Sequence, residues 1–385
     1  MQFALWAYAW DLLDEGVSDV VARLQELGIT ELNLATNYHH VQAFAPHNPE
    51  RRTFFAEASS YFQPGEGYGT LEPIPNETMG DADWVDEIAA ELAGTAVSLN
   101  SWTVGVHNSR LGMRHPETTI ENAFGDDLVF GLCPSNPAVQ TYLRTLVADL
   151  ADRNQFERIE LETFDYFYGT GFGWHHEKFH ARLGTLGEFL FGLCFCPDCR
   201  GHAADQGVDV DRARSVVRET VDGIVAGDVP HDAAVGAWLR AHPAVSGYVD
   251  AREETLSALY RDLDRAAGSA SLGSYVGLLS VGQTWMQGVD LHALADSVDY
   301  YTVAAYESSR EAAVDCLHEA DALTPEIPLH AGVLPAHPVV EDGDTLAAIV
   351  DGLVDAGTPR ISFYNYGLLP ERNLDWIADA TEPHR

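Results

Sequence analysis

Acidic side chains stand at the ends of two β-like runs. Glu160 and Glu162 lie in RIELETFDY, and Tyr306 and Glu307 close DYYTVAAYE. Because strand side chains alternate between two faces, Glu160 and Glu162 share a face, with Glu162 nearer the carboxyl end. Glycosidic cleavage uses one carboxyl group to protonate the leaving oxygen and another to attack carbon or activate water. The pattern predicts Glu162 as the acid, Glu307 as the nucleophile or base, and Glu160 as a partner beneath Glu162. The alternative is that one of these acids forms a structural ion pair with an arginine.

Aromatic, amide and imidazole side chains gather near the predicted strand ends. Sugars stack their CH faces on aromatic rings while amides and imidazoles bind hydroxyl groups, so this mixture is typical of a carbohydrate pocket. The candidate ligand-binding residues are Trp6, Tyr8, His39, Trp102, His107, Asn108, Arg110, Glu160, Asp165, Trp174, His175, His176, Tyr306, Asn365 and Tyr366. A single aromatic residue at such a place more often packs in the core, so the interpretation depends on the clustering.

One stretch matches a different catalytic pattern. His176-Glu177-Lys178-Phe179-His180 has the His-Glu-x-x-His spacing that places two imidazoles on one helical face in zinc peptidases. No third ligand follows it, so a zinc peptidase is a remote alternative. An active-site metal held by His39, His176 and an acid would instead favour lyase or isomerase chemistry. A barrel that binds a sugar without cleaving it is a further alternative.

The cysteines form a second chemical group. Cys194, Cys196 and Cys199 fall within six residues in CFCPDC, and Cys133 precedes a predicted helix. Three thiolates can wrap one tetrahedral ion, and a fourth ligand closes the shell at Zn–S distances of about 2.3 Å. A closed shell leaves no position for water, so we expect a structural zinc ion. The alternative is a set of small buried hydrophobic side chains, which is what we expect of Cys316.

This arrangement resembles that of the family-42 glycoside hydrolases, the zinc-containing β-galactosidases, over roughly residues 96 to 200. The matching elements are Cys133 in GLCPSNP, Glu162 in RIELETFDY, and the three cysteines of CFCPDC. The resemblance implies a sugar-cleaving barrel with a bound zinc ion. The family has an Asn-Glu pair where this chain has Leu161-Glu162, and the run IPLHAGVLP contains no acidic residue. The Glu-x-Glu run and the Tyr306-Glu307 pair are also similar to motifs of family-18 chitinases.

The elements that must position these residues alternate along the whole chain. Eight β-rich runs are separated by helical patterns, at residues 3–10, 31–37, 96–106, 158–164, 272–279, 300–306, 328–334 and 360–366. This α/β pattern predicts one (β/α)8 (TIM) barrel over residues 1–385, with the active site at the carboxyl ends of the strands. The rival is a doubly wound open sheet, but no Gly-x-Gly-x-x-Gly follows the first run. We expect no organic cofactor. The segment 165–270 is too long for one crossover, so we expect an inserted subdomain that carries the cysteine motif.

The charge balance narrows the class of partner. The 385 residues include 59 Asp and Glu against 22 Lys and Arg, a formal net charge of −37, and Lys178 is the single lysine. Such a surface repels phosphate backbones and anionic lipid, so the expected partner is a small carbohydrate, without nucleic acid or membrane; a homo-oligomer is compatible with the sequence. Acidity spread along the chain resembles that of haloarchaeal proteins, which work in molar salt. No signal peptide or membrane-spanning segment is readable, so we expect a cytoplasmic protein with reduced thiols.

Overall fold

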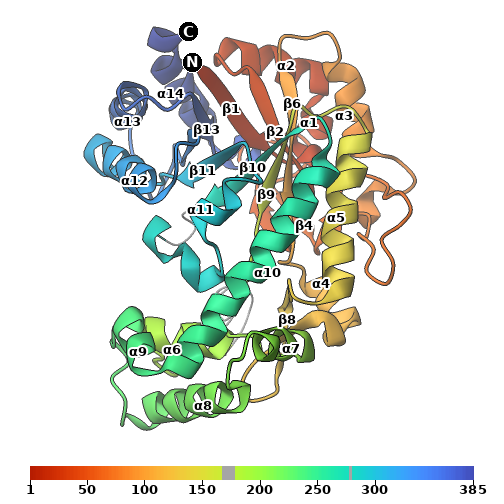
Figure 1. Cartoon of the computed structure of the whole chain (residues 1–385). Helices are drawn as coiled ribbons and strands as arrows, with labels where there is room; N and C mark the ends of the chain where they lie inside the picture. The colour runs from red at the N-terminus through yellow and green to blue at the C-terminus, as the bar shows by residue number, and fades with distance from the viewer. Residues whose placement is uncertain (167–177, 277–279) are drawn as a thin grey trace.

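The computed structural model describes residues 1–166, 178–276 and 280–385. Eight parallel strands form the centre of the fold: β1 (Gln2–Ala7), β2 (Glu31–Tyr38), β6 (Ser98–Val104), β9 (Arg158–Glu162), β10 (Ser271–Val276), β11 (Tyr300–Ala304), β12 (Leu329–Val333) and β13 (Arg360–Phe363). Strand β1 pairs with both β13 and β2, so the sheet closes on itself. The predicted (β/α)8 barrel is therefore confirmed, and the open sheet is excluded (Figure 1).

Short antiparallel pieces extend the loops of the barrel. Strand β5 (Ser59–Ser60) pairs with the end of β2, and two hairpins are formed by β3 (Val41–Phe44) with β4 (Thr53–Ala56) and by β7 (Thr119–Glu121) with β8 (Asp127–Leu132). Both hairpins lie in loops that follow barrel strands, the first after β2 and the second after β6. These loops leave the carboxyl ends of the strands, where barrel enzymes place their active sites.

The helices are α1 (Ala9–Glu15), α2 (Val17–Glu26), α3 (Trp84–Leu92), α4 (Ser109–Arg114), α5 (Pro137–Asp152), α6 (Gly184–Gly192), α7 (Pro197–Asp205), α8 (Val210–Ala226), α9 (Val235–Ala241), α10 (Pro243–Ala267), α11 (Leu291–Leu294), α12 (Arg310–Leu323), α13 (Gly343–Asp355) and α14 (Glu371–Thr381). Short 3₁₀ helices lie at Glu77–Met79, Pro116–Thr118, Val281–Gln287, Tyr366–Leu368 and Glu382–His384. Helix α5 shows how the sequence fixes these boundaries: the Asn136 side chain accepts hydrogen bonds from the Ala138 and Val139 amides, and Pro137 occupies the first turn.

Helices α6 to α10 occupy the long segment between β9 and β10. Figure 1 shows α6 to α9 gathered beyond one end of the barrel, while α10 runs from this group back along the barrel beside α5. Because α10 leads directly into β10, its carboxyl end lies where the strands begin and its amino end lies where they finish. The group of helices therefore stands beside the carboxyl ends of the strands.

A buried polar cluster fills the barrel near the amino ends of its strands. The guanidinium of Arg360 is fully buried and contacts the carboxylates of Glu160 and Glu31, the latter at 2.9 Å, and it donates to Asn33. Tyr300 also donates to Glu160. Buried charges are costly unless they are paired, so this cluster accounts for acids that point into the barrel. It forms the layer beneath the site described below.

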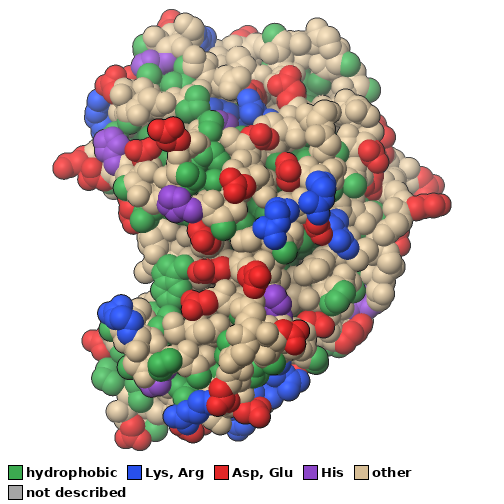
Figure 2. Space-filling view, viewed as in Figure 1, with side chains coloured by type: hydrophobic (Ala, Val, Ile, Leu, Met, Phe, Trp, Pro, Cys, Tyr) green, Lys and Arg blue, Asp and Glu red, His purple; other side chains and the backbone are tan. Residues whose placement is uncertain are grey.

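Acidic side chains are scattered over both the barrel and the helices beyond it on the face that Figure 2 shows. Within the described residues, no helix is both long enough and apolar enough to cross a membrane.

Candidate active site

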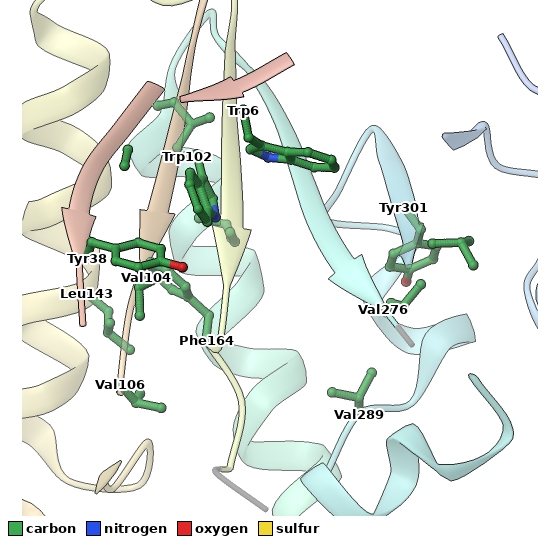
Figure 3. Close-up of a cluster of buried hydrophobic side chains, with 14 of the residues drawn as sticks. Trp6, Tyr38, Trp102, Val104, Val106, Leu143, Phe164, Val276, Val289 and Tyr301 are labelled. Atoms are coloured by element: carbon green, nitrogen blue, oxygen red, sulfur yellow. The ribbon is translucent and has the colours of Figure 1, made fainter. Parts of the chain in front are cut away.

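A pocket lies at the carboxyl ends of the strands. Each of the eight barrel strands, or the residues that immediately follow it, contributes at least one side chain to the lining. Its lining is Trp6 from β1, Tyr38 from β2, Trp102 from β6, Glu162 from β9, Tyr275 from β10, Thr302, Ala304 and Tyr306 from β11 and the residues after it, Gly332 from β12, and Tyr364 after β13. Its volume is about 210 Å³. Figure 3 shows Trp102 between Tyr38 and Trp6, and the ring centroid of Trp102 lies 4.6 Å from that of Tyr38 and 6.4 Å from that of Trp6. Most of the lining is aromatic, which suits one sugar ring.

Glu162 is the acidic group of this pocket. Its carboxylate accepts a hydrogen bond of 2.5 Å from Nε1 of Trp102, and it is the only acidic side chain among the described residues that line the pocket. Burial raises the pKa of Glu162 to about 7, although the bond from Trp102 opposes part of this rise. Near neutral pH a large fraction of this carboxyl therefore carries a proton, as a general acid requires.

Phenols line the same pocket as Glu162. The Tyr364 hydroxyl lies 3.2 Å from that of Tyr8 and 3.4 Å from that of Tyr38. Burial raises the pKa of Tyr38, Tyr306 and Tyr364, and the charge of Glu162 adds to each rise, whereas the hydrogen bonds with Tyr38 and Tyr8 oppose part of the rise at Tyr364. These groups therefore stay protonated, which makes them hydrogen-bonding groups rather than nucleophiles.

The floor joins the pocket to the polar cluster below. Trp6 donates from Nε1 to the Tyr275 hydroxyl at 2.5 Å, and Tyr275 in turn donates to Glu160. This chain fixes the orientation of both aromatic side chains. Glu160 thus has the expected place beneath Glu162, with its oxygens engaged by Arg360, Tyr275 and Tyr300.

Small residues line the β11 and β12 side. A Cβ added at Gly332 would lie 3.1 Å from the Trp6 ring, so even alanine would crowd the neighbouring indole there. Ala304 contributes only a methyl group. The Thr302 hydroxyl is buried, and no hydrogen-bond partner for its Oγ1 occurs among the described residues. An unpartnered hydroxyl in a ligand-sized cavity is suited to a polar group of a bound molecule.

The structure distributes the other predicted site residues around the pocket. The Tyr8 ring stacks on Trp10 behind the lining, with centroids 4.3 Å apart. The ring centroid of His39 lies 4.2 Å from that of Tyr38 and 4.5 Å from that of His107. These two imidazoles therefore flank the aromatic wall of the pocket. Trp6, Trp102 and Tyr306 line the pocket itself.

Five further candidates are engaged elsewhere. Arg110 pairs with Glu57 at 3.0 Å and with Glu77 at 2.8 Å, and Asn108 caps α4 by accepting from the Leu111 amide. Asn365 accepts from the Gly367 amide, and Tyr366 donates to Glu15. Asp165 accepts from Gln287 at 3.2 Å, and burial raises its pKa to about 7. The described pocket lining includes none of these five residues.

Glu307 is also absent from the described lining. Thr302, Ala304 and Tyr306 line the pocket, whereas Glu307 lies beyond the end of β11, where its amide donates to the Ala305 carbonyl. Burial raises the pKa of Cys316 on α12, and the charge of Glu307 is the second largest cause of that rise, so Glu307 lies near α12. Among the described lining residues, Glu162 is therefore not accompanied by Glu307.

Some predictions fall on residues that the structure does not describe. Trp174, His175 and His176 lie outside the described ranges, and so does Glu177 of the His-Glu-x-x-His match. Of that pentapeptide, only Lys178, Phe179 and His180 are described, and they are not helical.

Sequence reasoning missed six lining residues: Tyr38, Tyr275, Thr302, Ala304, Gly332 and Tyr364. All but Tyr38 lie within the predicted strands, and Tyr38 follows one directly. The usable signal was strand alternation, because inward positions recur every second residue. Counting by two from Tyr300, which contacts Glu160, gives Thr302, Ala304 and Tyr306.

The four cysteines form a separate buried cluster beside the site. The sulfur of Cys133 lies 3.7 Å from that of Cys196, 3.4 Å from that of Cys199 and 3.5 Å from that of Cys194. All four sulfurs lie within 4.8 Å of one another. A tetrahedral ion with Zn–S bonds of about 2.3 Å requires sulfurs about 3.8 Å apart, whereas a disulfide requires about 2.05 Å. The donor set thus fits one metal ion.

This cluster braces the loop that follows Glu162. Cys133 precedes α5, Cys194 and Cys196 lie between α6 and α7, and Cys199 lies in the first turn of α7. Next to them, the hydroxyls of Ser135 and Tyr166 lie 2.5 Å apart, and the Tyr166 amide donates to Gln287. Arg252 lies over the Tyr166 ring at 4.3 Å. A metal ion here would hold the chain four residues beyond Glu162 in place.

A larger hollow of about 600 Å³ lies at the opposite end of the barrel, lined by residues that include Gln2, Thr30, Ser98 and Glu157. Its described lining contains no aromatic side chain. We therefore identify the smaller pocket as the candidate active site.

Comparison with solved structures places the fold among known enzymes. A β-galactosidase from psychrophilic Marinomonas ef1 has a TM-score of 0.58 at 12% identity, and the match covers 100% of this chain and 59% of that one. A β-galactosidase from the haloarchaeon Halorubrum lacusprofundi has a TM-score of 0.58 at 14% identity, covering 99% and 58%. The catalytic domain of a β-amylase from Paenibacillus polymyxa has a TM-score of 0.56 at 10% identity, covering 98% and 97%.

The chain spans less than two thirds of the length of these β-galactosidases. No protein-family model and no curated protein matches its sequence. At such identities the likeness shows the fold: the chain shares a closed (β/α)8 barrel with these three enzymes.

Proposed function

We propose that the protein hydrolyses glycosidic bonds and that Glu162 is the general acid. The observation that carries this proposal is a carboxyl group with a pKa of about 7 inside an aromatic pocket at the carboxyl ends of the strands. A protonated Glu162 donates its proton to the glycosidic oxygen as the bond to the anomeric carbon breaks. Trp6, Trp102 and Tyr306 pack against the sugar.

The pocket dimensions support a single sugar as the tightly held group. Typical pockets for drug-sized ligands measure about 300–1,000 Å³, and the described pocket is smaller, at about 210 Å³. All eight strands contribute to its described lining. On the side toward the amino ends of the strands, the pocket ends at Tyr275, which donates to Glu160 of the polar cluster with Arg360. The substrate therefore enters with a terminal sugar and leaves the rest of the molecule outside.

We propose further that the cysteine cluster holds a structural zinc ion. Four thiolates complete a tetrahedral shell without a position for water or substrate, so the ion takes no part in the reaction. Its effect is mechanical: Cys133 and Cys199 join the start of α5 to α7, and Ser135 beside Cys133 contacts Tyr166 in the loop after Glu162.

The test is a panel of nitrophenyl glycosides assayed in molar potassium chloride. Glu162→Gln keeps the size of the side chain and its acceptor for Trp102 but removes the proton, so activity falls by about 10²- to 10⁴-fold. Glu219→Gln on the exposed side of α8 is the control and retains wild-type activity. Full activity of a folded Glu162→Gln variant would refute the acid role. Sugar binding by the wild type without any cleavage would instead identify a sugar-binding barrel.

A further inference from the structure

We propose that Thr163, Phe164 and Gly105 form a turn that keeps the mouth of the pocket open beside Glu162, and that this turn determines how large a leaving group the enzyme accepts. This inference rests on the proposed function and adds to it the residues that select the leaving group. It starts from a break in the strand alternation directly after the acid.

The alternation along β9 predicts a side chain at the place where the leaving group must lie. Glu160 and Glu162 point into the barrel, so the next inward position is residue 164. Two residues of strand advance the chain by about 6.6 Å, which carries residue 164 to the mouth of the pocket, next to the oxygen that Glu162 protonates. On β11 a side chain does occupy the equivalent place, because Tyr306, two residues beyond Ala304, lines the pocket.

Phe164 does not follow this alternation. Its side chain is fully buried, and the described lining of the pocket does not include it. The ring lies instead against Gly105, the first residue after β6: a Cβ added at Gly105 would lie 2.7 Å from the Phe164 ring. Phe164 belongs to the cluster of buried hydrophobic side chains drawn in Figure 3. The absence of a side chain at Gly105 therefore makes room for this ring away from the mouth.

The backbone of Thr163 causes the break. Its φ is +53°, in the left-handed region that β-branched residues rarely adopt. The carbonyl before it, that of Glu162, accepts from the Gly105 amide at 2.9 Å. The carbonyl of Thr163 itself accepts from the next amide, that of Val106, at 2.8 Å. In a regular strand two successive carbonyls point to opposite sides, so two that face the same segment mark the point where the alternation ends.

The surroundings hold this turn, and the Thr163 side chain does not. The Thr163 hydroxyl is buried, and its Oγ1 has no hydrogen-bond partner among the described residues. Beyond Phe164, the Tyr166 amide donates to the Gln287 carbonyl at 3.0 Å, and the Tyr166 hydroxyl lies 2.5 Å from that of Ser135. A disfavoured backbone conformation that persists because its neighbours fix it is typical of a functional constraint. Thr163 is thus a positioning residue, which directs Phe164 away from the leaving group.

The main test is Gly105→Ala, whose added methyl group collides with the Phe164 ring and displaces it. The substrates are the fluoride, 4-nitrophenyl and 4-methylumbelliferyl glycosides of the sugar that the wild type cleaves best. Their leaving groups increase in size, and the two phenols have similar acidity. We expect kcat/KM to fall by about 10-fold or more for the methylumbelliferyl glycoside, by less for the nitrophenyl glycoside, and by less than about 3-fold for the fluoride.

The control is Gly236→Ala on α9, where an added Cβ approaches only the end of the Arg240 side chain, at 3.7 Å. It is expected to keep the wild-type kcat/KM for all three substrates. The double variant Gly105→Ala/Phe164→Leu removes the ring that collides, so it is expected to regain the wild-type preference among the three leaving groups.

Thr163→Asn tests the turn by a measurement other than activity. Asparagine adopts the left-handed conformation more readily than a β-branched residue, so the urea midpoint of unfolding is expected to rise. This variant adds nothing at Gly105, so it tests the proposal even where Gly105→Ala does not fold. An unchanged or lower midpoint would overturn the strained turn on which the proposal depends.

The activity outcomes separate this inference from the proposed function. An equal loss for all three leaving groups, no loss for any of them, or a double variant no better than Gly105→Ala would overturn this inference and leave the acid role of Glu162 standing. Cleavage of none of the glycosides by the wild type would refute the proposed function itself, and this inference with it.

Discussion

Replacing Glu162 by glutamine is expected to stabilise the protein at alkaline pH while it lowers the activity toward unactivated glycosides. Burial raises the pKa of Glu162 from 4.5 to about 7, so the folded state holds this proton more tightly than the unfolded state does. As the pH rises from 4.5 to 7, the unfolded chain ionises the group first, and the free energy of unfolding falls. Above about pH 7 both states are ionised and the loss is complete. Glutamine cannot ionise, so the variant escapes this loss.

The magnitude follows from the pKa difference. One pKa unit corresponds to 1.36 kcal/mol, so the shift gives the variant an advantage of about 3 kcal/mol at pH 8 and less than about 1 kcal/mol at pH 5. The value at pH 8 is an upper bound, because Glu162 is only half-buried and partly solvated through the pocket. The amide oxygen of glutamine can still accept from Trp102, so the hydrogen bond at 2.5 Å does not change the comparison.

The assay is urea unfolding of the wild type, Glu162→Gln and the control Glu219→Gln, in the same molar potassium chloride at pH 5 and pH 8. The expected result is a gain in the free energy of unfolding that grows with pH for Glu162→Gln and is absent for the control. A gain that is the same at both pH values, or a loss at pH 8, would refute the idea that a destabilised carboxyl stands in this pocket.

Three further perturbations test separate parts of the structure. Trp102→Phe removes the donor that lowers the pKa of Glu162, so the alkaline limb of the kcat/KM profile moves up by about 1–2 pH units; an unchanged or lower limb would contradict this role. Cys199→Ser is expected to lower bound zinc from about one equivalent to less than half and to lower the free energy of unfolding by about 3 kcal/mol or more. Cys316→Ser, outside the cluster, keeps the metal. Equal zinc in both variants by metal analysis would argue against the site. Arg360→Met leaves two buried carboxylates unpaired and lowers the free energy of unfolding by about 3–5 kcal/mol, measured by urea; a loss below about 1 kcal/mol would contradict the pairing.

The barrel could be predicted from the sequence because its physical signal repeats. Each of the eight strands is a short apolar or β-branched run followed by a helical pattern, and all eight lie within two or three residues of their predicted bounds. Strand β1 ends at Ala7 rather than Trp10 because α1 begins at Ala9. Such ends are set by local caps, which periodicity alone does not resolve.

The position of Glu162 on β9 could be predicted from strand alternation, whereas the position of Glu307 could not. Glu160 and Glu162 share a strand whose alternation is regular, so their common face follows from their spacing. Glu307 lies three residues beyond the end of β11, and its selection depended on its position near the rim rather than on its phase with Thr302 and Ala304. Phase, applied strictly, favours Tyr306 as the pocket residue.

Side-chain contacts between distant segments could not be predicted from the sequence. The bond from Trp102 to Glu162 and the contacts of Tyr364 with Tyr8 and Tyr38 depend on how far each side chain reaches across the barrel. The cysteine motif, in contrast, was recognisable because three ligands lie within six residues. The position of Cys133 beside them is a property of the fold.

The central claim is that Glu162 protonates the departing oxygen, and the dependence of its mutant on the leaving group tests this most directly. The measurement is kcat/KM for wild type and Glu162→Gln with aryl glycosides of one sugar whose phenols range from strongly to weakly acidic. A strongly acidic phenol departs without a proton, so the account predicts a small loss for dinitrophenyl substrates and a loss of about 10³-fold or more for unactivated phenyl substrates. An equal loss across the series would contradict the assignment of Glu162 as the acid.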